Sequence, residues 1–177
     1  ITKEKQILKK EKGIQMDLFS SSIIKNNVKK SHTQHKIITT FLEAERLIYQ
    51  LNHEKEVSVK LCTTSTDSFK TNVFGISFCN IEKQAYFIFL PHNDLFPLLR
   101  QLFENNQILI IGNDLKFQIK VLTQNNINVK ARLFDIGIAH YLLQPDMRHD
   151  INTLTENYLN YYIQSIEDFI GRGKHKK

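Results

Sequence analysis

Glu56-Val57-Ser58-Val59-Lys60-Leu61-Cys62 alternates polar and apolar side chains without a break. Such alternation is typical of a strand with one buried face, so Val57, Val59 and Leu61 are expected in the core. Lys60 and Cys62 then share the opposite face, because residues two apart on a strand project to the same side. The stretch therefore predicts a strand and makes Lys60 and Cys62 neighbours at any site on that face.

Two more strands are expected soon after it, at residues 72–79 and 84–90, and the short turns between them indicate an antiparallel meander. Before the first strand, Thr40 and Glu43 have the spacing of a capping box, which predicts a helix to about Leu51. Ordered structure is expected to begin near Thr40.

The second half alternates helices with short strands. Asp94 is expected to cap a helix to Phe103, with Pro97 in its first turn. The other expected elements are strands at 107–111 and 127–133, and helices at 114–123, 135–143, 150–159 and 165–170. Asp135 and Asp150 are the expected caps of two of these helices. The fold class is therefore α/β: a mixed sheet made of a three-strand antiparallel meander followed by βα units, with helices on both faces.

Composition divides the chain into two parts. With 177 residues and 41% hydrophobic content, it can bury one core. Residues 1–36 hold nine lysines against three acidic residues, whereas the remainder carries equal numbers of basic and acidic side chains. We interpret 1–36 as a basic flexible arm, whose lysines either contact DNA or only keep it solvated, and 37–177 as one domain.

The cysteines and the hydropathy favour a cytoplasmic protein. Cys62 and Cys79 have no Cys or His partners at metal-ligand spacing, so reduced structural thiols are expected. No apolar run reaches the roughly 20 residues of a membrane span, and no signal-peptide pattern opens the sequence. We expect a monomer with no membrane contact.

Five segments, in uninterrupted order over about residues 40–177, resemble the 3'-5' exonuclease domain of bacterial DNA polymerase I, in a degenerate form. The segments are Thr63-Thr64-Ser65-Thr66-Asp67 with Phe74-Gly75-Ile76-Ser77-Phe78, then Gly112-Asn113-Asp114-Leu115-Lys116-Phe117-Gln118, then 133–145, Arg148-His149, and 170–174. The resemblance implies a ribonuclease-H-like (DnaQ-like) fold, and it places the family's third motif, Tyr-x-x-x-Asp, beyond Lys177.

The resemblance also implies that the catalytic site has been lost. Active members hold two divalent ions about 3.5–4 Å apart through carboxylates, which hard cations prefer. Lys60 and Cys62 stand at the family's Asp-x-Glu positions, and Gln118 stands at the metal-binding Asp of the second motif. An ammonium repels a cation and a thiol is a poor ligand for magnesium, while Gln118 is interpreted as a neutral replacement. We therefore expect no cofactor and no exonuclease activity, in a fragment of a DNA polymerase I that supports the polymerase domain in cis or guides DNA.

Two alternatives stay open. In the first, Asp67, Asp114 and Asp135 rebuild a Mg²⁺-dependent exonuclease, although each also has a structural explanation as a turn residue, a helix start and an N-cap. In the second, the chain is a free-standing nucleic-acid-binding domain. His140 and His149, expected on different helices, are assigned core or capping roles rather than metal binding.

Overall fold

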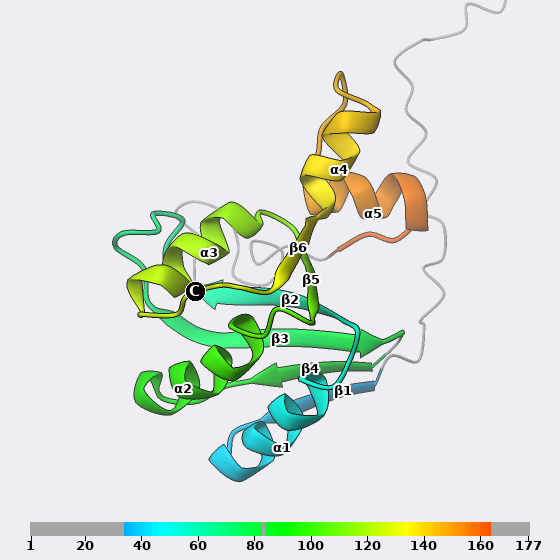
Figure 1. Ribbon diagram of the computed structural model, residues 1–177. Coiled ribbons are helices and arrows are strands. Elements are labelled where there is room, and N and C mark those ends of the chain that lie inside the picture. The colour runs from blue at the N-terminus through cyan, green and yellow to red at the C-terminus, as the bar shows by residue number, and fades with distance from the viewer. Residues whose placement is uncertain (1–33, 83, 164–177) are drawn as a thin grey trace, which may run out of the picture.

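The computed structural model describes residues 34–82 and 84–163, which form one six-stranded sheet with helices packed against it (Figure 1). The strand order is β1-β4-β3-β2-β5-β6. The strands are β1 (Gln34–Ile38), β2 (Glu56–Thr63), β3 (Val73–Ile81), β4 (Gln84–Ile88), β5 (Leu109–Gly112) and β6 (Arg132–Asp135). The helices are α1 (Phe41–Leu51), α2 (His92–Phe103), α3 (Leu115–Gln124), α4 (Ile136–Leu143) and α5 (Ile151–Leu159).

The predicted antiparallel meander is confirmed. β3 pairs antiparallel with both β2 and β4, and β5 and β6 then extend the sheet in parallel on the other side of β2. The mixed α/β class expected from the sequence is therefore correct. The α4 and α5 helices extend past the end of β6, away from α1 and α2 (Figure 1).

The core lies between one face of the sheet and helices α1 and α2, and Leu115, Val121 and Leu122 of α3 belong to it. Val57, Val59 and Leu61 of β2 are buried there, as their alternation predicted, while Ser58 and Lys60 on the other face are exposed. Burying a large aliphatic side chain stabilises a fold by about 1.5–3 kcal/mol. This one-sided burial holds the register of β2, because a slip by one residue would turn Lys60 into the core.

Strand β1 was not expected, and three of its residues had been assigned to the arm. It pairs in parallel with β4, from Gln34 opposite Gln84 to Ile38 opposite Ile88. Only Ile38 is buried. Backbone pairing at a sheet edge therefore forms this strand without any alternation of side chains, so the arm ends earlier than residue 36. The rest of the arm, residues 1–33, and the helix expected at 165–170 lie outside the described residues.

Two helix starts differ from expectation. The Thr40 hydroxyl donates to the Glu43 carboxylate at 3.0 Å, and it makes no bond to a backbone N–H, so the predicted capping box does not form. Helix α2 begins at His92 after Pro91, whose carbonyl accepts from the N–H groups of Asp94 and Leu95. Asp94 thus lies in the first turn instead of capping it, and Pro97 falls in the second turn.

The last strand starts five residues later than predicted. Lys130 and Ala131 donate their N–H groups to the Phe103 carbonyl at the end of α2, and Ile127 donates to Leu122. These bonds hold residues 127–131 against the ends of α2 and α3, so pairing with β5 begins only at Arg132. No helix in the described ranges is long and apolar enough to cross a membrane.

Candidate functional site

Lys60 and Cys62 lie side by side on the face of β2 that points away from the core. Lys60 is exposed and Cys62 is half-buried. Across the sheet, Lys60 is opposite Ser77 of β3, and Cys62 is opposite Gly75. The strand thus presents these two residues as the sequence predicted, and neither supplies a carboxylate.

The Cys62 thiol is held in its neutral form. Burial raises its pKa above the ordinary value for a cysteine, against smaller opposing effects from a hydrogen bond with the Ser77 side chain and from the charge of Lys60. Metal ions bind cysteine as the thiolate, so a thiol that resists deprotonation is a weak ligand. Cys62 and Cys79 are both free thiols, and both are half-buried.

Gln118 has a structural role that the sequence did not reveal. It is only 1% exposed, and both ends of its amide are bonded. The Leu61 N–H donates to Oε1 at 2.9 Å, and Nε2 donates to the Asn113 carbonyl at 3.0 Å. The pairing of β2 with β5 ends at Ser58 and Ile111. Beyond that point, the Gln118 side chain connects β2 to Asn113, the residue that follows β5.

A carboxylate could not replace this amide. Asp and Glu accept hydrogen bonds when ionised but cannot donate one to the Asn113 carbonyl. The hydrogen-bond partners around residue 118 thus match an amide, so Gln118 is more than the uncharged replacement expected from the sequence. No motif or spacing signals this role, because it depends on where the Leu61 N–H points after the fold is formed.

Asp135 is an acid whose oxygens are all engaged in holding backbone. Oδ1 accepts from the N–H groups of Gly137 and Ile138 at the start of α4, at 2.9 and 3.2 Å. Oδ2 accepts from the N–H of Leu115, the first residue of α3, at 2.7 Å. The predicted N-cap of α4 is confirmed, and the same carboxylate also serves α3.

Asp114 and Asp67 take local structural positions. Asp114 precedes α3 with a left-handed backbone (φ 55°), which Asp tolerates better than most residues, and its side chain makes no capping bond. Asp67 accepts from the N–H of Phe69 at 3.0 Å within a turn, as expected. Over residues 34–82 and 84–163, no three His, Cys, Asp or Glu side chains gather in a way that could hold a metal ion.

His140 and His149 are in direct contact, which their separation in sequence did not suggest. Their Nδ1 atoms lie 2.7 Å apart, so one ring donates to the other. His140 on α4 is buried, which agrees with the core role expected for it, and the Tyr158 ring meets it edge-on. His149 was expected on a helix, but it lies just before Asp150, the N-cap of α5, and outside any helix. The pair links α4 to the segment that leads into α5.

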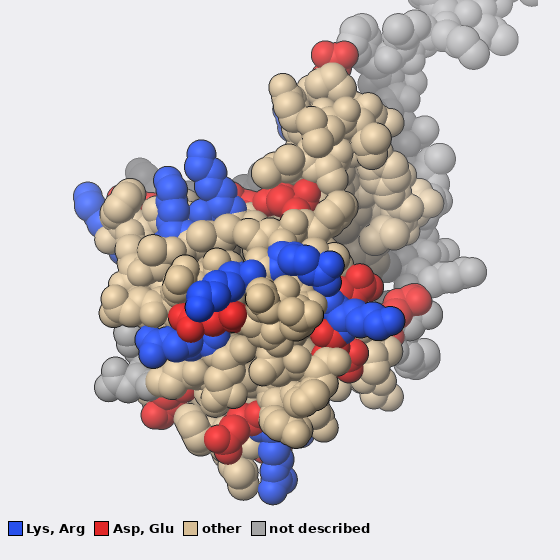
Figure 2. Space-filling view, viewed as in Figure 1, with Lys and Arg blue, Asp and Glu red and all other residues tan. Residues whose placement is uncertain are grey.

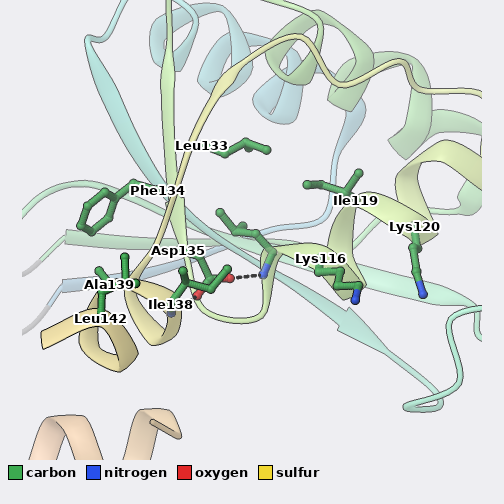
Figure 3. A pocket seen from close by; sticks show the side chains of 10 residues that line it. Lys116, Ile119, Lys120, Leu133, Phe134, Asp135, Ile138, Ala139 and Leu142 are labelled. Atoms are coloured by element: carbon green, nitrogen blue, oxygen red, sulfur yellow. Dashed lines mark hydrogen bonds between the residues drawn. The ribbon is translucent and has the colours of Figure 1, made fainter. Parts of the chain in front are cut away.

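A separate groove of about 530 Å³ lies between α3, β6 and α4 (Figure 3). Phe134, Ile138 and Leu142 make its walls largely apolar, and Lys116 and Lys120 extend from α3 on its rim. The three positions Lys60, Cys62 and Gln118 do not line it. In the view of Figure 2, basic side chains gather over α3, while basic and acidic groups are interspersed elsewhere on that face.

Lys60, Cys62 and Gln118, which the sequence resemblance matches to the family's ligand positions, do not fit a pair of divalent ions. Hard cations need charged or carbonyl oxygens, but these positions offer an ammonium, a neutral thiol and an amide whose only oxygen is already bonded to the Leu61 N–H. The arrangement can bind backbone atoms and attract anions. It lacks the donors that assemble a two-metal site.

Comparisons of sequence agree on one family. A family model described as 3'-5' exonuclease matches residues 35–177. DNA polymerase I of Borreliella burgdorferi is 31% identical over 185 residues, covering 96% of this chain, and that of Pseudomonas aeruginosa is 28% identical, covering 63%. The chain spans 20% and 14% of the lengths of these two relatives.

Solved structures share the fold at low sequence identity. Escherichia coli RNase D superposes with a TM-score of 0.64 at 13% identity, covering 76% of this chain and 36% of the other. The catalytic core of RRP6 from Trypanosoma brucei superposes with a TM-score of 0.63 at 16% identity, covering 78% of this chain and 40% of the other. These structures show the shared fold, while the family-model match over residues 35–177 and the 31% identical relative place the chain in the family of 3'-5' exonuclease domains of bacterial DNA polymerase I.

Proposed function

We propose that this chain is a catalytically inactive member of its family, a 3'-5' exonuclease-like domain that has a structural or DNA-guiding role within a DNA polymerase I. The polypeptide that carries it is then a DNA-directed DNA polymerase of replication and repair, working in the cytoplasm with its polymerase domain in cis.

The bonding of Gln118 is the observation that carries this proposal. Two-metal hydrolysis needs ions that activate water and stabilise the leaving oxygen. The Gln118 oxygen is taken by the Leu61 N–H, and its amide nitrogen holds the Asn113 carbonyl. Lys60 places a positive charge on the neighbouring face of β2, and this charge repels a divalent cation that approaches that face. This combination supports a site that binds no metal pair.

A nuclease assay tests the proposal directly. The purified chain is incubated with a 5'-labelled single-stranded oligonucleotide in about 5 mM Mg²⁺ and, separately, in about 5 mM Mn²⁺, because two-metal hydrolysis depends on divalent ions. We expect no shortened products above a blank without protein. An active family member serves as the positive control for substrate and buffer.

Digestion that disappears on chelation and survives repurification would overturn the proposal. Asp114→Asn and Asp135→Asn then identify the source of activity. Loss of digestion in either variant would support a site rebuilt from relocated acids, whereas digestion that both variants retain would assign the activity to other residues of the chain.

A further inference from the structure

Helices α4 and α5 form a small unit past the end of β6, and two histidines lie at its centre (Figure 1). His140 is the buried residue of α4, and Leu154 is the buried residue of α5. Leu154 lies outside the main hydrophobic core. Because this unit buries so little else, the contact between His140 and His149 is a main connection between α4 and the residues that lead into α5.

Two tyrosine rings border the histidine pair. Tyr158 of α5 meets His140 edge-on, with ring centroids 5.6 Å apart, and Tyr141 of α4 meets His149 edge-on at 5.4 Å. The His140 Nε2 atom is buried, and it has no hydrogen-bond partner among the described residues. His149 is half-buried. One ring of the pair is therefore shielded from water on the side away from its partner.

The 2.7 Å contact between the two Nδ1 atoms holds a single hydrogen. In the neutral pair, one ring donates from Nδ1 and the other accepts. One added proton leaves three hydrogens on four nitrogens, so both Nε2 atoms then carry one. The His140 Nε2–H is in that case buried in a charged pair without an acceptor, which is more costly than the same omission in a neutral pair. A second added proton puts a hydrogen on each Nδ1 and breaks the contact.

Protons therefore favour an open form in which residues 144–150 leave α4. Both rings then face water and can each take up a proton. The ordinary pKa of histidine is about 6.5, so below about pH 7 the open form binds more protons than the closed form. Opening becomes more favourable as pH falls, by about tenfold between pH 7.5 and 5.5 for each histidine that titrates only in the open form.

The other groups around the pair do not change charge in the same way over this range. Tyr141 and Tyr158 are neutral from about pH 5.5 to 7.5. Hydrogen bonds from Thr153 hold the pKa of the Asp150 carboxyl below its ordinary value, so the cap of α5 stays ionised. Helix α4 carries no Lys, Arg, Asp or Glu. The remaining charged groups on the flanking segments are Asp135, Asp146, Arg148 and Glu156.

We propose that the His140–His149 contact is a pH-sensitive switch, which holds residues 144–150 and α5 on α4 near neutral pH and releases them on acidification while the sheet stays folded. Neither histidine is among the residues matched to the family's ligand positions, so the switch is independent of the inactive-site proposal. It lets a change of protonation alter the position of α5 without unfolding the domain.

Amide hydrogen exchange of the full 177-residue chain, followed by mass spectrometry at pH 7.5 and 5.5, tests the switch. After correction for the chemical exchange rate at each pH, the protection of residues 141–159 should be lower at pH 5.5 by at least about tenfold. Residues 57–63 of β2 and 73–81 of β3 serve as the internal reference, and their protection should change less than about threefold.

Two variants remove the pair from opposite sides. His140→Phe keeps an aromatic ring against Tyr158 but cannot take up a proton, and His149→Ala opens the His140 Nδ1 to water in the closed form. Both should reduce the response to acid to less than about twofold. His53→Ala is the matched control, because His53 is exposed and its Nδ1 contacts only the Tyr49 carbonyl among the printed bonds of this turn, and it should keep the wild-type response.

Thermal melting confirms that each variant is folded, and His149→Ala decides the question if His140→Phe does not fold. Equal protection of residues 141–159 at both pH values in the wild type would overturn the switch. A tenfold fall that both variants retain would also overturn it, because the titrating group would then lie elsewhere. An equal fall in β2 and β3 would contradict it as well, since acid would then destabilise the whole domain.

Discussion

Gln118 binds backbone near the carboxyl-terminal ends of β2 and β5, and Asp135 does so at the end of β6, yet one is an amide and the other an acid. Asp135 faces three N–H donors, which a carboxylate satisfies completely. Gln118 faces one donor, the Leu61 N–H, and one acceptor, the Asn113 carbonyl, which an amide satisfies and an ionised carboxylate does not. The difference teaches that the backbone around each position selects its side chain. At position 118 that environment disfavours an ionised carboxylate.

Removing the Asp135 carboxylate should have the largest effect. Asp135→Ala leaves three N–H groups at two helix starts without their acceptor. Loss of a cap typically costs about 0.5–2 kcal/mol, so a cap shared by two helices should cost about 3 kcal/mol of unfolding free energy. Urea denaturation followed by circular dichroism measures it. Asp135→Asn, which keeps one acceptor oxygen, should lose roughly half as much; a loss below about 1 kcal/mol for Asp135→Ala would contradict the shared cap.

Gln118→Glu tests the other half of the comparison. The new carboxylate can still accept from Leu61, but it faces the Asn113 carbonyl, so we expect a loss of about 2 kcal/mol at neutral pH. Burial and that carbonyl should raise the pKa of the new carboxyl above its unfolded value.

The sign of the pH effect follows from this shift. The folded variant binds the proton more tightly than the unfolded chain, so its stability falls as pH rises through the raised pKa and recovers on acidification. Denaturation at pH 5 and pH 8, with the wild type as reference, measures the difference. A variant as stable as the wild type at pH 8 would show that an amide is not required at position 118.

Carboxylates on the β2 face should have a smaller effect. Lys60→Asp with Cys62→Glu places two acids two residues apart on one strand face, while Gln118 keeps its bonds. We expect weak Mn²⁺ binding with a Kd of about 1 mM, which at 5 mM Mn²⁺ would stabilise the fold by about 1 kcal/mol. The melting temperature with and without Mn²⁺ measures it, and the wild type should show no shift. An equal shift in the wild type would contradict our description of the site.

The smallest expected effect concerns the Cys62 thiol. Because burial raises its pKa, a smaller fraction is thiolate at pH 8 than in an unfolded chain. Alkylation by iodoacetamide, followed by mass spectrometry in a Cys79→Ser background, should be severalfold slower in the folded protein than in urea. The contribution of this group to stability is present below its ordinary pKa and declines as pH rises through the raised value. Equal rates in both states would show an accessible, ordinary thiol.

The sequence by itself determined the central part of the fold. Alternation through Val57, Val59 and Leu61 predicted β2 and its buried face, because a strand exposes every second residue to the same surroundings. The caps Asp135 and Asp150 were also predictable, since an N-cap acts on N–H groups two or three residues away. Both signals are local, and both are borne out.

Only the tertiary structure decided the interactions between distant segments. Strand β1 forms by pairing with β4 although its side chains show no pattern, and β6 starts late because residues 127–131 bond to the ends of two helices. The second cap made by Asp135, the contact between His140 and His149, and the bond from the Leu61 N–H to Gln118 join positions between 9 and 57 residues apart. The hydrogen-bond partners of these side chains come together only after the sheet is assembled, so no spacing in the sequence records them.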